Sequence, residues 1–327
     1  CGICGFTGYR QDQKTVIERM MKAIEYRGPD SEGSFCREKI TLGFRRLSII
    51  DLEDGQQPME SADGNLHIVF NGEIYDYKEL RAELETFGIS FCTHSDTEVL
   101  VNTLQQYGEK ALDKLRGMFG FAVWNEKEQT LMLARDFFGI KPVYYAEIDG
   151  HFVFASEIKS ILAFPGYERK VNQKALEQYL SFQYSPLEET FFKGIYKLMP
   201  GHMLLYKNGN YEIKTYFKTK LTPGKWNRKT NMDQLRSQLS EILKDSVKHH
   251  MLSDVEVGAF LSGGVDSGYL ASSSGADQAF TVGFDEGDRY SEVNKAAKVA
   301  EKAGLKHHVK IISKQEFWDA LPDVMYH

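Results

Sequence analysis

The feature that most constrains the fold is a change in the order of predicted elements near residue 220. Before it, short apolar strands follow one another through turns such as Asp149-Gly150 and Asn208-Gly209, dipeptides that favour two-residue β-hairpins. After it, the predicted strands 255–261, 279–284 and 308–312 alternate with helical patterns. Hairpin-connected strands and strand–helix alternation are typical of different fold classes, so the chain is predicted to form two domains.

The predicted boundaries follow from this change. Residues 1–215 are expected to form an antiparallel α+β domain, and residues 232–327 a doubly wound, parallel α/β sheet. Residues 216–231 are predicted to be a linker, because 218–230 hold five basic residues, no acid and a Pro-Gly pair. The alternative is a solvated loop inside one domain. A doubly wound sheet usually has five or six strands, so the second domain is expected to be incomplete.

Four local predictions concern the first domain. A helix is expected over 14–26, and a hairpin between 117–124 and 129–135, from the spacing of apolar residues. A short strand over 67–70 is expected to end at Asn71-Gly72. Ser95 to Glu98 has the pattern of a capping box at the start of a helix.

Composition excludes several classes of protein. The 327 residues carry 40 basic and 46 acidic side chains, a formal charge of −6, which disfavours a general nucleic-acid binder. No apolar run approaches the ~18 residues of a membrane helix, and the start has no signal-peptide pattern. Four cysteines are too few for a disulfide scaffold. A cytoplasmic location is therefore expected, with no membrane partner.

The sequence starts at Cys1, which would carry both a thiol and a free α-amine. The amine has a reference pKa of ~7.7–8.0 and the thiol one of ~8.5, so part of the amine is unprotonated at neutral pH. Such an amine can activate a nucleophile on its own residue. One alternative is a trimmed initiator or tag. A Cys1–Cys4 metal or redox pair is disfavoured, because Cys36 and Cys92 are isolated.

A glycine loop follows the predicted strand 255–261. Gly263-Gly264 lets backbone amides approach an anion, and the helix that follows presents its positive end there. The hydroxyls of Ser262 and Ser267 can donate to phosphate oxygens, and Asp266 suits a Mg²⁺ ion bridging to them. The sequence lacks the G-x-x-x-x-G-K-[ST] motif. The loop predicts a nucleotide pyrophosphate site of another type, although a lone Ser-Gly-Gly is often only a turn.

Together these strings resemble a known family. The first domain resembles the glutaminase domain of amidotransferases with an N-terminal cysteine nucleophile, and the second resembles ATP pyrophosphatases. That pair, in that order, resembles the bacterial type of glutamine-hydrolysing asparagine synthetase. The strings that carry the resemblance are Cys1-Gly2-Ile3, Arg27-Gly28-Pro29-Asp30, Arg46-Leu47-Ser48-Ile49-Ile50-Asp51, Asn71-Gly72-Glu73-Ile74-Tyr75, Ser95-Asp96-Thr97-Glu98, Gly117-Met118-Phe119, Arg135-Asp136, Gly139-Ile140-Lys141-Pro142 and Ser262-Gly263-Gly264-Val265-Asp266-Ser267.

The resemblance implies an N-terminal-nucleophile hydrolase fold of layered antiparallel sheets with helices, and a role for each matched residue. Cys1 would attack the glutamine amide, with Asn71 and Gly72 as the oxyanion hole. Arg46 would hold the substrate α-carboxylate, and Glu73 and Asp96 the α-ammonium. The implied glutamine site is Arg46, Leu47, Ile49, Ile50, Asn71, Gly72, Glu73 and Asp96.

Each of these roles has a structural alternative. Arg45 and Arg46 are neighbours on a strand, and one of the two is expected to face solvent. Asp96 could serve only the helix terminus, where an anion is favourable. Asn71-Gly72 could be a plain hairpin turn.

For the second domain the resemblance implies ATP as substrate, with Mg²⁺ at Asp266. The implied ATP site is Leu261, Ser262, Gly263, Gly264, Asp266, Ser267 and Val282. The implied reaction activates the aspartate β-carboxylate as an adenylate, which ammonia attacks after passing through a tunnel that keeps it unprotonated. A homodimer is one option for the assembly, which the sequence leaves open.

Other interpretations stay open. The family's later motifs have no counterpart before His327, so a chain that ended there is expected to be a glutaminase only. Another carboxylate, from a cell-wall or polysaccharide precursor, could replace aspartate. Cys1 argues against a β-lactam-forming synthetase, and the Ser262–Ser267 loop against an amidophosphoribosyltransferase. A non-enzymatic nucleotide-sensing or scaffolding module would make residues such as Arg46 and Asn71 hard to explain.

Overall fold

The structure is a computed structural model that describes residues 1–221, 231–285 and 291–327. The chain divides into two compact units, residues 1–221 and 222–327. Most of the linker predicted at 216–231 falls on residues 222–230, which lie outside the described residues.

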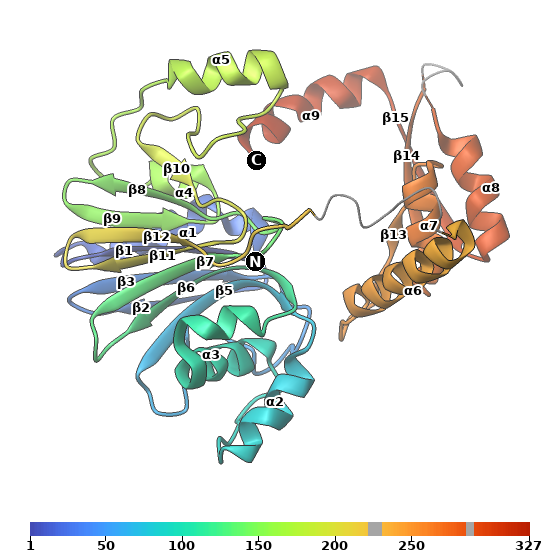
Figure 1. The fold of residues 1–327 in the computed structure, drawn as a ribbon. Helices are drawn as coiled ribbons and strands as arrows, with labels where there is room; N and C mark the ends of the chain where they lie inside the picture. The colour runs from blue at the N-terminus through green and yellow to red at the C-terminus, as the bar shows by residue number, and fades with distance from the viewer. Residues whose placement is uncertain (222–230, 286–290) are drawn as a thin grey trace. The chain divides into compact units, whose positions relative to one another are not determined.

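Two six-stranded antiparallel sheets form the first unit (Figure 1). The first sheet has the order β10-β8-β9-β1-β3-β2, and its strands are β10 (Ile195–Lys197), β8 (Tyr144–Ile148), β9 (His151–Ala155), β1 (Gly2–Thr7), β3 (Ile40–Arg46) and β2 (Ser31–Cys36). The second has the order β12-β11-β7-β6-β5-β4, and its strands are β12 (Asn210–Thr215), β11 (His202–Lys207), β7 (Thr130–Arg135), β6 (Gly117–Asn125), β5 (Leu66–Ile74) and β4 (Met59–Glu60).

The core of this unit lies between the two sheets. Ile3, Leu42 and Phe44 from one sheet pack in a single buried cluster with Val69 and Leu133 from the other. Helices α1 (Gln13–Ala23) and α3 (Asp96–Tyr107) contact the first and the second sheet, respectively. The remaining helical segments are η1 (Glu25–Arg27), α2 (Tyr77–Thr86), η2 (Gly108–Asp113), α4 (Ile158–Leu162) and α5 (Gln173–Phe182). The prediction of layered antiparallel sheets with helices is confirmed.

Several local predictions are confirmed and three need correction. The three predicted hairpins form, between β6 and β7, β8 and β9, and β11 and β12. The helix predicted over 14–26 ends at Ala23 and is followed by a 3-10 turn. The strand predicted over 67–70 does not end at Asn71-Gly72, because β5 continues to Ile74 and pairs with β6 throughout.

The predicted capping box at Ser95 to Glu98 is also wrong in its contacts. The Ser95 hydroxyl accepts from the Thr97 N–H. The Glu98 carboxylate turns away from the cap and accepts from the backbone N–H groups of Cys92, at 2.8 Å, and Thr93, at 2.7 Å. Glu98 thus stabilises the loop before the helix instead of closing the cap.

The second unit contains a three-stranded parallel sheet of β13 (Ala259–Phe260), β14 (Gln278–Phe284) and β15 (Lys306–Ile312). Its helices are α6 (Met232–His250), α7 (Val265–Ser273), α8 (Val293–Ala303) and α9 (Lys314–Tyr326). The strand predicted over 255–261 is confirmed only at residues 259–260. The alternation of parallel strands and helices agrees with the predicted α/β class.

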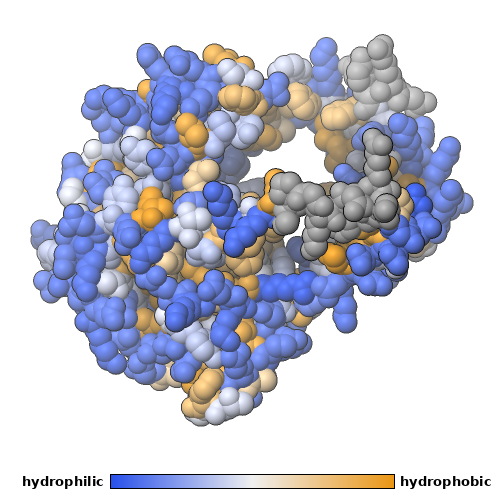
Figure 2. Space-filling model, in the orientation of Figure 1, coloured by the Kyte–Doolittle hydropathy of each residue, from blue (hydrophilic) through white to orange (hydrophobic). Residues whose placement is uncertain are grey.

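The visible surface of the first unit is mostly hydrophilic, with apolar residues scattered over it (Figure 2). Within the described ranges, no helix is both long enough and apolar enough to span a bilayer.

Candidate active site

A pocket that is partly open to solvent lies at the end of β1 and β3 in the first unit. It is lined by Cys1 and by seven of the eight residues predicted for the glutamine site: Arg46, Leu47, Ile49, Ile50, Gly72, Glu73 and Asp96. The pocket is also lined by Phe44, Gly55, Gln57, Phe70, Ser95 and Thr97. Residues from four separate stretches of the sequence therefore meet around the thiol of Cys1.

The amine and the thiol of Cys1 are both fixed by backbone groups. The amine donates to the carbonyl oxygen of Arg27 at 2.9 Å. The thiol lies 3.3 Å from both the N–H and the carbonyl oxygen of Leu47, just beyond β3. Burial, and then the charges of Arg27 and Lys141, lower the pKa of the amine to about 5. The amine is therefore neutral at pH 7 and can accept a proton.

Arg27 and Asn71 both contact the carbonyl oxygen of Cys1. The Nε–H of Arg27 donates to the carbonyl oxygen of Cys1 at 2.8 Å. With its amide oriented so that both ends are paired, Asn71 donates to the same oxygen at 3.3 Å and accepts from Arg27 Nη2 at 3.3 Å. Asn71 is buried and is the one residue predicted for the glutamine site that does not line the pocket.

Gly72 has no room for a side chain. A Cβ there would lie 2.1 Å from the carbonyl oxygen of Met118, because β5 and β6 pair closely at this point. Asn71-Gly72 is thus a segment of paired strand at the edge of the pocket. The alternative of a plain hairpin turn is wrong.

Arg46 is buried, and its guanidinium is wrapped by the loop that follows β3. It donates to the carbonyl oxygens of Ile50, at 3.3 Å, and Leu52, at 3.2 Å, and to that of Asp51. A buried guanidinium held in this way is a preorganised site for a carboxylate, which its planar fork can bind with two hydrogen bonds.

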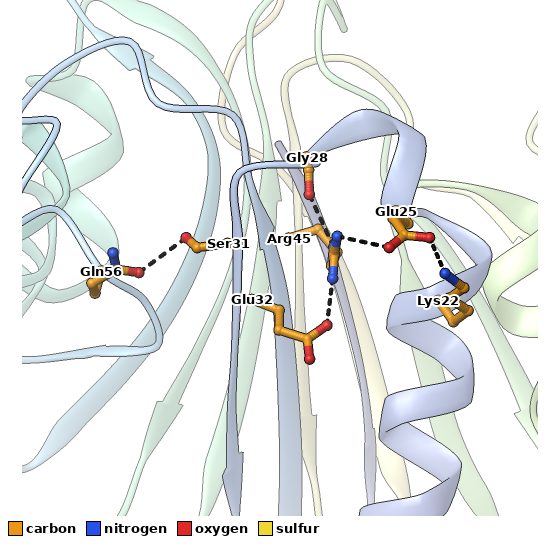
Figure 3. A network of polar contacts seen from close by, with 7 residues as sticks. All are labelled: Lys22, Glu25, Gly28, Ser31, Glu32, Arg45 and Gln56. Carbon is orange, nitrogen blue, oxygen red and sulfur yellow. Dashed lines mark hydrogen bonds and ion pairs between the residues drawn. The ribbon is translucent and has the colours of Figure 1, made fainter.

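The expectation that either Arg45 or Arg46 faces solvent is wrong, because both are buried. Arg45 donates to the Gly28 carbonyl oxygen at 2.9 Å and pairs with the carboxylates of Glu25 and Glu32 (Figure 3). Adjacent residues on a strand point to opposite faces, and here each face supplies its own partners.

Glu73 and Asp96 supply two buried carboxyl groups to the pocket. Asp96 accepts from the Ile74 N–H at 3.0 Å, so it links α3 to β5 and is not limited to the helix terminus. Burial, and then the charge of Glu73, raise the pKa of Asp96 to about 7. A bound cation would relieve this repulsion and favour the ionised form.

The pocket therefore combines a thiol beside a neutral amine, a buried guanidinium and two buried acids. An amino acid carries an α-carboxylate for the guanidinium and an α-ammonium for the acids. Its side chain could then reach the thiol. The arrangement is suited to nucleophilic attack on the side chain of a bound amino acid.

Sequence reasoning missed Gln57, which lines the same pocket. Its side chain exchanges hydrogen bonds with the backbone of Phe70, accepting from the N–H at 2.6 Å and donating to the carbonyl oxygen at 3.2 Å. It also donates to the Thr97 hydroxyl at 3.1 Å. Gln57 joins β5 to α3 below the pocket, and no local pattern in the sequence marks it.

Asp136 has a structural role that the sequence analysis did not predict. It is buried and accepts from the backbone N–H groups of Phe119, Phe138, Ile140 and Lys141. It thereby fixes the loop that carries Lys141, one of the charges that act on the Cys1 amine. In the sequence, Asp136 was marked only as part of Arg135-Asp136, one of the motifs that carry the family resemblance.

In the second unit the predicted glycine loop joins β13 to α7. The Ser262 and Ser267 hydroxyls lie 2.9 Å apart, and Gly264 is the N-cap of α7. Gly263 has a φ of +78°, which favours glycine. The Thr281 hydroxyl donates to the Leu261 carbonyl oxygen at 2.6 Å and so ties the loop to β14.

The other two residues predicted for ATP are placed on the same unit. Asp266 lies in the first turn of α7. Val282 lies on β14 with its side chain half exposed. In the part of the chain that the structure describes, no group of three or more His, Cys, Asp or Glu side chains could hold a metal ion.

Comparisons with solved structures identify the fold. A structure described as the allosteric regulatory enzyme of purine biosynthesis matches with a TM-score of 0.52 and 15% identity, covering 95% of this chain and 80% of that one. Glutamine phosphoribosylpyrophosphate amidotransferase from B. subtilis matches with a TM-score of 0.51 and 18% identity, covering 94% and 65%. At these identities the likeness concerns the fold alone.

Curated proteins found by sequence comparison have higher sequence identity to this chain than the two solved structures have. Asparagine synthetase (glutamine-hydrolyzing) 1 of Bacillus subtilis (strain 168) is 42% identical over 338 residues, covering 99% of this chain and 52% of the relative. Asparagine synthetase (glutamine-hydrolyzing) 3 of the same strain is 30% identical, covering 99% and 56%. The chain thus spans about half the length of these curated relatives.

Two families match the chain, one after the other. The asparagine synthase family matches residues 238–327, and the glutamine amidotransferase domain family matches residues 1–217. This order is the one that the sequence predicted. Because the amidotransferase match covers residues 1–217 of 327, more than half of the chain, the chain belongs to the glutamine amidotransferase family.

Proposed function

We propose that the first unit hydrolyses L-glutamine to L-glutamate and ammonia, with Cys1 as the nucleophile. The observation that carries the proposal is the pocket in which the Cys1 thiol, its neutral amine, Arg46, Glu73 and Asp96 meet. A substrate with both an α-carboxylate and an α-ammonium uses all the charged groups of this pocket. The thiol then faces the side-chain amide.

The proposed reaction has two halves. The thiol sulfur attacks the amide carbon, and its proton passes to the Cys1 amine. The carbonyl oxygen becomes an oxyanion beside Gly72 and the Asn71 amide, and such a donor contributes ~2.7–4 kcal/mol in measured cases. The intermediate collapses, the C–N bond breaks, and the amine returns its proton to the departing ammonia. Water then attacks the glutamyl thioester, releases glutamate and regenerates the thiol.

Asn71 must change partners for this role, because its amide now bonds to the Cys1 carbonyl oxygen. Catalytic hydrogen bonds are often incomplete without substrate and form in the complex. The 3.3 Å length of the present bond makes it a weak competitor for an oxyanion.

For the second unit we propose ATP-dependent activation of a carboxylate that the ammonia then attacks, with aspartate as the acceptor. The Ser262–Ser267 loop at the start of α7 suits a pyrophosphate group. The named relatives support aspartate as the acceptor, with its β-carboxylate activated as an adenylate and with Mg²⁺ beside Asp266. The products would be asparagine, AMP and pyrophosphate.

One experiment tests each half. Glutamate release from L-glutamine, measured for wild type and Cys1→Ala, tests the first; equal rates would overturn it. Pyrophosphate release with the protein expressed from its complete gene tests the second. Dependence on aspartate supports the proposed acceptor, whereas ATP turnover only with another carboxylate would replace it. ATP bound equally well by wild type and a Gly263→Ala variant would remove the loop from the proposal.

A further inference from the structure

Glu157 pairs with Arg27, whose guanidinium in turn holds the carbonyl oxygen of Cys1. It lies two residues beyond the end of β9, and the intervening Ser156 is bonded to β1: the Ile3 N–H donates to the Ser156 hydroxyl at 3.0 Å, and the Ser156 N–H to the Ile3 carbonyl oxygen at 2.8 Å. These two bonds fix the Glu157 backbone beside the start of β1. Glu157 does not line the pocket.

The side chain of Glu157 pairs with two cations. Oε1 accepts from Arg27 Nη1 at 3.0 Å, and Oε2 lies 2.9 Å from Lys159 Nζ. The Glu157 and Lys159 side chains are 17% and 12% exposed, so solvent screens these pairs little. Without the carboxylate, two largely buried positive charges would lie close together and repel each other.

Arg27, which Glu157 holds, in turn contacts Cys1 and Asn71. Its Nε–H holds the Cys1 carbonyl oxygen, its own carbonyl oxygen holds the Cys1 amine, and its Nη2 meets the Asn71 amide oxygen. The contacts with the Cys1 carbonyl oxygen and with Asn71 depend on the orientation of the guanidinium, whereas the Cys1 amine is held by the main chain of Arg27. Glu157 is the carboxylate paired with that guanidinium at Nη1.

We propose that Glu157 is a positioning residue for glutamine hydrolysis: through Arg27 it fixes the backbone of Cys1 and the amide of Asn71, which it does not itself touch. The proposal rests on the glutaminase function proposed above. Its consequence is specific, because the Glu157 carboxylate pairs with Arg27 and Lys159, and neither of these is assigned to the α-carboxylate or the α-ammonium of glutamine. Loss of the carboxylate should therefore slow the chemical step and leave substrate affinity nearly unchanged.

The test compares Glu157→Ala and Glu157→Gln with wild type. The kcat of glutamine hydrolysis is expected to fall about 10- to 100-fold in Glu157→Ala, as misplacement of reacting groups does elsewhere. KM should stay within about threefold, since uniform binding is not affected. Glu157→Gln keeps an acceptor for Arg27 and should retain more activity than Glu157→Ala. A matched rise in KM, or an unchanged kcat in both variants, would overturn the proposal.

Glu189→Gln is the matched control. Glu189 is also a glutamate of the first unit, 20% exposed, and is paired with Lys174 at 2.6 Å. It does not line the pocket. Its substitution should leave kcat and KM unchanged. If Glu189→Gln lowered kcat as much as Glu157→Ala does, the loss of activity would come from losing any ion pair of the first unit, and the specific role of Glu157 would be excluded.

A second readout does not depend on activity. The Cys1 amine is buried and held by Arg27, so acylation by an amine-reactive ester at pH 6 should be slow in wild type and in Glu189→Gln. In Glu157→Ala the guanidinium that holds the Cys1 carbonyl oxygen is released, which should loosen the main chain of Cys1 and speed acylation several-fold, measured by mass spectrometry of the N-terminal peptide. If wild type does not hydrolyse glutamine, the proposed function fails. An unchanged acylation rate would independently remove the role of Glu157.

Discussion

The α-amine of Cys1 donates a hydrogen bond to the carbonyl oxygen of Arg27, with the two atoms 2.9 Å apart. This contact draws the amine out of water and beside a guanidinium, and both effects oppose protonation. The first residue of the chain thus carries a thiol together with an amine that is neutral at pH 7.

The pH profile of the amine follows from its lowered pKa. The pKa falls from 8.0 to about 5, so the neutral form is fully present at pH 7 and is lost only below about pH 5. Addition of one glycine before Cys1 removes this amine from the thiol and should lower kcat by ~10²–10⁴, the usual contribution of a general base. Glutamate release measured with and without the extra glycine tests this. Equal rates would mean that another group takes the proton.

Asp96 predicts a second pH effect. Its pKa is raised to about 7, so it is largely protonated below pH 7 and cannot pair with an ammonium group. The KM for glutamine should therefore rise as the pH falls from 8 to 6. Asp96→Asn keeps an acceptor for the Ile74 N–H, but it should raise KM at pH 8 and abolish this dependence. A variant with the same profile as wild type would exclude Asp96 from substrate binding.

The role of Arg46 in glutamine binding can be tested by changing the loop that holds its guanidinium, without replacing Arg46 itself. A Cβ on Gly55 would lie 2.4 Å from Arg46 Nη2 and 3.0 Å from the Asp51 carbonyl oxygen. Gly55→Ala should displace the guanidinium and raise the KM for glutamine at least about tenfold, the equivalent of ~1.4 kcal/mol. Gly64→Ala is the control, since its Cβ would meet no atom within 4 Å. It should affect the thermal midpoint alone.

The glycine loop of the second unit gives a parallel prediction. A Cβ on Gly263 would lie 2.7 Å from Lys295 Cβ and 2.9 Å from the Ala296 N, at a φ of +78°. Gly263→Ala should weaken ATP binding, measured by calorimetry, while glutamine hydrolysis stays unchanged. Gly268→Ala is the control within α7, because its nearest neighbour, Val299 Cγ1, is 3.5 Å away. Equal ATP affinity in both variants would contradict the assignment.

The sequence predicted elements best where the signal is local. Asp149-Gly150 marks the hairpin between β8 and β9 because a two-residue turn needs residues that accept a positive φ. Asn71-Gly72 has the same kind of signal and misled the prediction. There, pairing of β5 with β6 on a buried sheet outweighs the turn preference of two residues.

Burial of charge was harder to predict. Arg45 and Arg46 are both buried because each has partners from distant segments, and a single sequence does not show those contacts. Gln57 was missed for the same reason: its partners are the backbone of Phe70 and the hydroxyl of Thr97, which only the folded chain brings together. The pocket residues that were predicted correctly all belong to motifs that resemble those of the amidotransferase family.

The most direct measurement is the mass of the protein before and after treatment with an electrophilic glutamine analogue, followed by peptide mapping. The account predicts one adduct, on Cys1, which excess L-glutamine prevents. The exposed thiol of Cys92 is an internal control for non-specific alkylation and should stay unmodified. No adduct while the Cys1 amine is confirmed free, or an adduct on Cys92 instead of Cys1, would contradict the assignment of Cys1 as the glutaminase nucleophile.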